Sequence, residues 1–172
     1  MNGDYTVFGS EILIQRNWSK FNSWVSYTIN RNRYYFDSYI PNEFPNNFEI
    51  QQNVACAVSY ENKGLKVGIG WKWNSGRPTT NPLIVDGKTI HYKLPNSDSV
   101  TDYIQSNLSM SYVRTISKTV QINISGSLLN IFNRSNVINK YYRVNNFSDK
   151  IEDVSVYSMK RTPNISIRAT FK

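Results

Sequence analysis

The stretch LKVGIGWKWN, residues Leu65–Asn74, decides the fold of this chain. Read with a period of two, one of its faces is apolar throughout, with Leu65, Val67, Ile69, Trp71 and Trp73. The opposite face has only Lys, Gly and Asn. A helix, with its period of 3.6 residues, would mix these two sets. The stretch is therefore expected to be a strand with one apolar and one polar face.

The same alternation recurs along the chain and predicts seven strands. We expect them at residues 5–18, 21–33, 49–61, 65–74, 103–114, 120–131 and 164–172. The connections between them alternate between short links, at residues 19–20, 62–64 and 115–119, and long loops, at residues 34–47, 75–102 and 132–163. The last long loop has the pattern of a further hairpin. The expected fold class is all-β, an antiparallel up-and-down meander of about seven strands.

Strict alternation of short and long connections is typical of transmembrane β-barrels, whose turns are short on the periplasmic side and long outside the cell. A soluble β-sandwich has no reason to keep this alternation. The meander is thus expected to be the closing part of a large transmembrane barrel. Because bacterial barrels usually have an even number of strands, we expect further strands before Met1.

Aromatic residues gather where the predicted strands end. At the short links and at the chain end lie Trp18, Phe21, Tyr60, Tyr112 and Phe171. Other aromatic residues, including Phe36 and Phe132, lie near the long loops. Two aromatic belts separated by aliphatic residues are expected at the two interfaces of a membrane. The side chains expected to face lipid are Val67, Ile69, Trp71, Trp73, Leu108, Met110, Ile122, Ile124, Ile165 and Ile167.

Composition excludes several other classes of protein. The 172 residues suffice for one domain, and residues 1–172 are treated as one. Their net charge of +8 comes from basic residues that look scattered rather than clustered, so no nucleic-acid partner is expected. Cys56 is the only cysteine, which excludes an internal disulfide framework. No apolar run approaches the ~20 residues of a transmembrane helix.

The sequence predicts no catalytic or metal site. His91 has no second His or Cys near it that would complete a metal site. A single loop histidine is also a poor anchor for a Ser-His-Asp arrangement. We therefore expect neither an enzyme nor a cofactor.

Several motifs in order resemble the C-terminal part of a TonB-dependent outer-membrane receptor of the type common in Bacteroidetes. They are GSEILIQ, WVSYTIN, FEIQQNVACAVSY, SGRPTTNP, DYIQSNLSMSY, LLNIFNRSN and TPNISIRATF. The residues that carry the resemblance are Gly76, Arg77, Pro78, Asn130, Asn133, Pro163 and Asn164. The chain departs from the family pattern at Gln105 and Asn107, where the family often has Arg and Asp. Ile50, Gln51 and Gln52 likewise stand where it often has Arg, Pro and His.

The resemblance implies an active importer in the cell outer membrane. The whole receptor would be a barrel of about 22 strands filled by an N-terminal plug. Its partners would be outer-membrane lipid, that plug, the remaining barrel strands and TonB, which acts through the missing N-terminal part. The ligand would belong to the siderophore, cobalamin or glycan class. The long loops are expected outside the cell, but the sequence singles out no ligand-binding residues.

The alternative interpretation is a soluble or surface-attached all-β binding module whose positive charge engages an anionic polymer. Such a module would stay soluble without detergent. A barrel segment would aggregate, because its apolar faces and strand edges are exposed.

Overall fold

The structure is a computed structural model and describes residues 3–86, 89–92, 94–145, 147–148 and 150–171. Every element in these ranges is a strand, which confirms the all-β class. The long strands are β1 (Asp4–Trp18), β2 (Phe21–Tyr35), β4 (Gln52–Asn62), β5 (Leu65–Asn74), β10 (Tyr103–Ser117), β11 (Val120–Leu129) and β14 (Thr162–Phe171). The others are β3 (Glu43–Pro45), β6 (Pro78–Thr79), β7 (Pro82–Asp86), β8 (Thr89–Tyr92), β9 (Asp98–Ser99), β12 (Val137–Val144) and β13 (Ile151–Tyr157).

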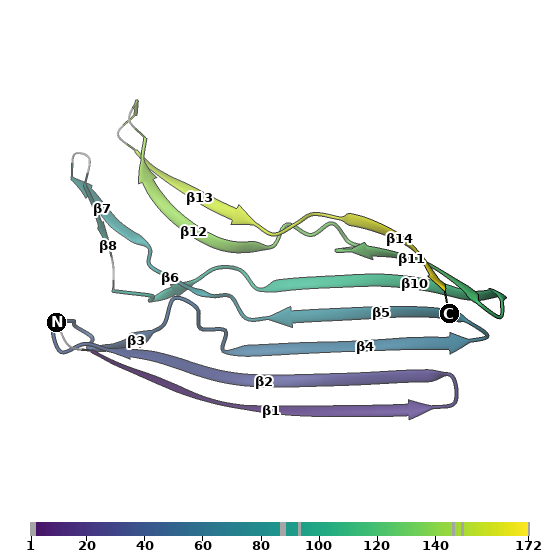
Figure 1. The fold of residues 1–172 in the computed structure, drawn as a ribbon. Helices are drawn as coiled ribbons and strands as arrows, with labels where there is room; N and C mark the ends of the chain where they lie inside the picture. The colour runs from purple at the N-terminus through teal and green to yellow at the C-terminus, as the bar shows by residue number, and fades with distance from the viewer. Residues whose placement is uncertain (1–2, 87–88, 93, 146, 149, 172) are drawn as a thin grey trace.

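The long strands form one antiparallel sheet in the order β1-β2-β4-β5-β10-β11-β14, with β3 added to β2 (Figure 1). Each long strand pairs with the long strand before it, so the up-and-down meander is confirmed. β1 and β14 lie at opposite edges of the sheet and do not pair with each other. Each edge strand therefore has one side without a neighbouring strand.

The two ends of this sheet differ in their connections. The three tight turns lie at one end, called the turn end, where β14 also finishes. The long connections lie at the other end, called the loop end, and from it the hairpins β7–β8 and β12–β13 project (Figure 1). The short connections and the long connections, which alternate along the sequence, thus lie at opposite ends of the sheet.

The turn between β4 and β5 shows why these connections are short. Lys63 and Gly64 both have positive φ angles, 47° and 84°. A two-residue turn with this geometry matches the right-handed twist of its strands. A Cβ on Gly64 would also lie 2.4 Å from the Val113 carbonyl oxygen. Glycine is therefore needed at this position for two separate reasons.

The long connections are more structured than the sequence predicts. β3 lies in the first, β6 to β9 lie in the second, and β12 and β13 form the expected hairpin in the third. β3 and β6 to β9 have only two to five residues each, too few for hydrophobic periodicity to reveal them. The predicted strand over residues 49–61 begins only at Gln52, because the Glu49 carboxylate crosses to accept the Asn32 backbone N–H at 3.0 Å.

The pairing register separates the sheet into an apolar face and a polar face. Residues directly opposite each other in an antiparallel sheet share a face. One such row on the apolar face is Val58, Ile69, Leu108 and Leu128, and the adjacent row on the polar face is Ser59, Gly68, Ser109 and Ser127. By the same registers, all ten side chains expected to face lipid lie on the apolar face.

The apolar face has almost no protein covering it. Phe44 and Val100 are the only buried hydrophobic side chains among the described residues. By contrast, Ile69 is 50% exposed and Ile167 is 72% exposed. A soluble domain of this length would bury a core of such residues. The described part of the chain therefore leaves its main apolar surface for something else to cover.

Candidate ligand site at the loop end

The three long connections meet in a pocket of about 310 Å³, called the loop pocket. Each connection contributes to its lining. The first supplies Asn47 and Phe48, the second Arg77, Pro78, Thr79, Thr80, Tyr92 and Asn96, and the third Asn139, Lys140, Tyr141 and Tyr142. A pocket built from segments this far apart in sequence is a candidate ligand site.

Arg77 joins the first and third connections across this pocket. Its guanidinium donates to the Asn47 carbonyl oxygen from Nη2 at 3.1 Å and to the Ile138 carbonyl oxygen from Nη1 at 3.1 Å. The same group lies 4.8 Å from the centre of the Phe48 ring, in cation–π contact. Arg77 therefore holds the pocket together without a carboxylate partner among the described residues.

Gly76 and Pro78, the neighbours of Arg77 in the SGRP motif, set its position. The Gly76 N–H donates to Asp102 Oδ1 at 3.1 Å, and the other Asp102 oxygen accepts the Trp73 indole N–H at 3.1 Å. A Cβ on Gly76 would lie 1.7 Å from the Val100 carbonyl oxygen, so the two segments approach closely. Pro78 pairs with Ser99 in the β6–β9 ladder.

Asn96 closes the pocket from the second connection. It is 7% exposed, and its side chain donates to the Pro45 carbonyl oxygen at 2.7 Å and to Asn47 Oδ1 at 2.5 Å. Its backbone N–H donates to Thr80 Oγ1 at 2.9 Å. The sequence does not identify this residue, because its partners become neighbours only when the loops meet.

The β12–β13 hairpin brings a second cation to the pocket. Lys140 Nζ lies 2.7 Å from Asp153 Oδ2 and 5.1 Å from the centre of the Tyr142 ring. The hydrogen bond to Asp153, followed by that to Tyr142, raises the pKa of Lys140 above its ordinary value. The Tyr142 hydroxyl donates to Asn81 Oδ1 at 2.6 Å and so connects the hairpin to the second connection.

The charged pairs of this hairpin predict a pH dependence. Hydrogen bonds from Asn145 and then Arg143 lower the pKa of Glu152, so the stabilisation by Glu152 is lost as pH falls through the acid range. The raised pKa of Lys140 means that its contribution is lost in the alkaline range. We expect amide-exchange protection factors in β12 and β13 to be level between roughly pH 5 and pH 10 and to fall on both sides.

The variant Glu152→Gln is the matched control for this prediction. It should remove most of the fall in protection on the acid side and leave the fall on the alkaline side unchanged. An unchanged acid-side fall in this variant would contradict the assignment to Glu152.

The pocket lining has side chains that can recognise a polar ligand. Its lining has two cations, four aromatic rings and several amide groups, but no carboxylate. Aromatic faces and amides bind polar ligands that carry hydroxyl or anionic groups. His91 is on β8, paired with Ile84, and is not among the residues that line the pocket. No group of three or more His, Cys, Asp or Glu within the described ranges is placed to hold a metal ion.

The LLNIFNRSN motif forms a second junction at the loop end. Asn130 is 2% exposed, and its side chain donates to the carbonyl oxygens of Arg134 at 2.9 Å and Met159 at 3.2 Å. It also accepts the Arg134 N–H at 3.0 Å. Asn133 Oδ1 accepts the Arg161 N–H at 3.0 Å. Both asparagines have positive φ, so this motif is a hydrogen-bonded turn.

The last motif residues belong to the sheet. Pro163 pairs with Leu128 and Asn164 with Ser127, near the start of β14. β14 is an edge strand, where proline is tolerated because its missing N–H need not pair. Asn164 lines a hollow of about 340 Å³ on the polar face, with small residues such as Ser109 and Gly126 around it.

Gln105 and Asn107, two positions at which the sequence departs from the resemblance, take part in a neutral chain of hydrogen bonds. The Gln105 amide donates to Asn107 Oδ1 at 2.8 Å, and the same oxygen accepts the Asn130 N–H at 3.0 Å. The two neutral side chains are thus connected to the LLNIFNRSN turn. Ile50 and Gln51 lie before β4, in the segment that Glu49 draws toward β2.

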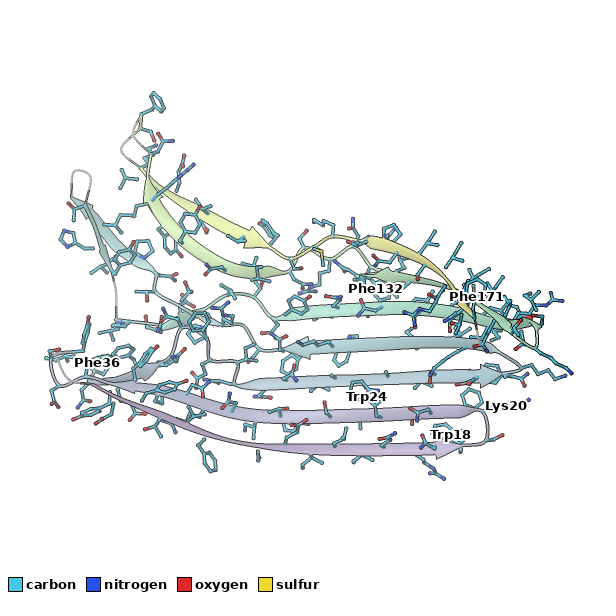
Figure 2. The ribbon with its side chains drawn as sticks, in the orientation of Figure 1. Trp18, Lys20, Trp24, Phe36, Phe132 and Phe171 are labelled. Atoms are coloured by element: carbon cyan, nitrogen blue, oxygen red, sulfur yellow. The ribbon has the colours of Figure 1, made fainter. Side chains whose placement is uncertain are left out.

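The predicted interface aromatics lie on the apolar face at the turn end (Figure 2). The rings of Trp18 and Phe21 are 5.9 Å apart, and those of Phe21 and Tyr60 are 5.0 Å apart. Tyr112 lies between Leu65 and Ile124 in the register. Phe171 is paired with Val120 and is 77% exposed. Together they form a band across the sheet.

No protein-family model and no curated protein matches this chain. Among the described residues there is also no helix long and apolar enough to cross a membrane.

Proposed function

We propose that this chain is part of the barrel wall of a TonB-dependent outer-membrane receptor, which imports a ligand across the outer membrane. The observation that carries the proposal is the uncovered apolar face. With only Phe44 and Val100 buried among the hydrophobic residues described, burial within the protein cannot offset the cost of exposing this face to water. Lipid is the solvent in which such a face is stable.

The difference between the two ends of the sheet supports a particular orientation of the strands across the membrane. Tight turns belong on the periplasmic side of an outer-membrane barrel and long connections outside. The loop pocket then faces the medium, where a ligand arrives. Its aromatic, amide and cationic lining fits a polar ligand with hydroxyl or anionic groups, within the glycan or chelate classes.

The alternative, a soluble module that binds an anionic polymer, requires a cover for the apolar face. Nothing in the described ranges supplies one, and each edge strand has an unpaired side. The membrane-spanning proposal accounts for both features, because lipid covers the face and further strands continue the sheet.

Cysteine labelling in intact cells tests the proposal. In a Cys56→Ser background of the whole displayed protein, Ser97→Cys places a thiol in the second long connection, and Lys63→Cys places one in a tight turn. A membrane-impermeant maleimide should label Ser97→Cys in intact cells, and Lys63→Cys only after lysis. The reverse pattern would invert the topology. Recovery of the protein in a detergent-free soluble fraction would overturn the membrane proposal.

A further inference from the structure

The basic residues, which look scattered in the sequence, gather at the turn end of the sheet. Among the described residues, seven basic residues lie there, namely Arg16, Lys20, Lys63, Lys66, Arg114, Lys118 and Arg168, with Glu61 as the one acidic residue. The remaining thirteen basic and eleven acidic residues of the sequence nearly balance. The net charge of +8 therefore comes mainly from residues at one end of the sheet.

Five of these cations form a rim next to the aromatic band. Lys20, Lys63 and Lys118 each lie in one of the three tight turns. Arg16 pairs with Ser23 and Arg114 with Ile122, so both lie on the apolar face. All five side chains are exposed. We call this set the basic rim.

The basic rim has no acidic partner in the described part of the chain. Glu61 lies 3.7 Å from Lys66, which is on the polar face with Ser111. Arg168 pairs with Asn123 and is also on the polar face. Arg16 Cζ lies 5.8 Å from the centre of the Trp18 ring, which joins the rim to the aromatic band. Figure 2 shows Trp18 and Lys20 together at this end.

We propose that the basic rim binds the phosphate groups of anionic phospholipids in the leaflet at the turn end. The inference rests on the proposed membrane-spanning function and adds a lipid preference to it. Aromatic side chains sit at the level of the headgroups, and cations beside them attract anionic lipid. The long apolar stems of Lys and Arg let the charge reach that level from the apolar face.

The distribution of the rim favours lipid over an acidic protein. Its three lysines occur once in each tight turn, spread along the turn end of the sheet, and do not form one compact patch. A layer of headgroups meets every turn equally, whereas a protein partner would contact a limited patch.

Tryptophan quenching in vesicles tests the inference with the whole protein. The vesicles contain phosphatidylcholine and phosphatidylglycerol, one of which is brominated on its acyl chains. For the unmodified protein we expect brominated phosphatidylglycerol to be enriched at the protein surface by about fivefold or more, given the attraction per cation. The enrichment should disappear at high salt, because salt screens exposed charges.

A variant of the tight turns and a charge-matched control distinguish the effect of the basic rim from the effect of the net charge of the protein. K20Q/K63N/K118Q removes three rim cations, with Asn at position 63 because Asn tolerates the positive φ. It should lose most of the phosphatidylglycerol enrichment. K150Q/K160Q/R161Q removes the same charge at the loop end and should keep it. Equal loss in both variants would overturn the inference.

The remaining outcomes distinguish the inference from the proposed function. Equal quenching of the unmodified protein by both brominated lipids, at low and high salt, would overturn the lipid preference and leave the membrane-spanning strands in place. It would direct attention to an acidic protein partner at the turn end. Quenching by neither lipid would overturn the proposed function and this inference together. The salt series needs no variant, so it remains decisive even where a substitution prevents folding.

Discussion

Replacing Leu108 with Arg should destabilise the folded protein in a bilayer by roughly 2 to 4 kcal/mol, because the charge would face the hydrocarbon. Leu108 pairs with Ile69 on the apolar face, between the band at the turn end and the tryptophans toward the loop end. The measurement is the free energy of unfolding of the whole protein by urea or guanidinium in phospholipid vesicles.

Ser109→Arg is the matched control, one residue away on the polar face. Ser109 pairs with Gly68 and lines the hollow there, where an Arg side chain has room and water. We expect a cost below about 1 kcal/mol, because the lumen face of a barrel tolerates charge. Similar costs at the two positions would show that the faces do not differ in solvent and would remove the main support for the proposed function.

Replacing Asn130 with Ala should open the LLNIFNRSN turn at a cost of about 3 kcal/mol. The substitution leaves the part-buried Arg134 N–H and two carbonyl oxygens without their partner, and each such loss costs about 1 kcal/mol. It also puts a non-glycine residue without a polar side chain at φ 52°. Amide exchange in residues 130–136 should become about 100-fold faster.

Two further variants separate the causes of this loss. Asn130→Gly keeps the positive φ without strain and removes only the hydrogen bonds, so it should recover part of the stability. Asn133→Gly removes a single hydrogen bond, to Arg161, and should cost about 1 kcal/mol. If Asn130→Ala were no more costly than Asn133→Gly, the role assigned to Asn130 would be wrong.

Four of the residues that carry the family resemblance have a common physical role in this structure. Gly76 allows close approach to Val100, Arg77 joins two connections, and Asn130 and Asn133 close a turn. All four hold the long connections against the ends of the strands. Of the four, Arg77 also lines the loop pocket.

The sequence by itself determined the sheet. The period of two in Leu65–Asn74 placed β5 correctly at both ends, and the tight turn at Lys63 and Gly64 was visible from residue type. Strand periodicity and turn chemistry are local properties, which neighbouring residues decide. For the same reason, the alternation of apolar and polar residues identified ten side chains for the apolar face, and the pairing register places all ten on one face.

Only the tertiary structure decided where distant residues meet. Asn47, Asn96 and Lys140 show no common pattern in the sequence, yet they line one pocket. Lys20, Lys63 and Lys118 are far apart along the chain, and the meander brings all three to the turn end of the sheet. The short strands β6 to β9 depend in the same way on partners supplied by the folded loops. Contacts between segments far apart in the sequence depend on the register and order of the strands, and no local pattern encodes them.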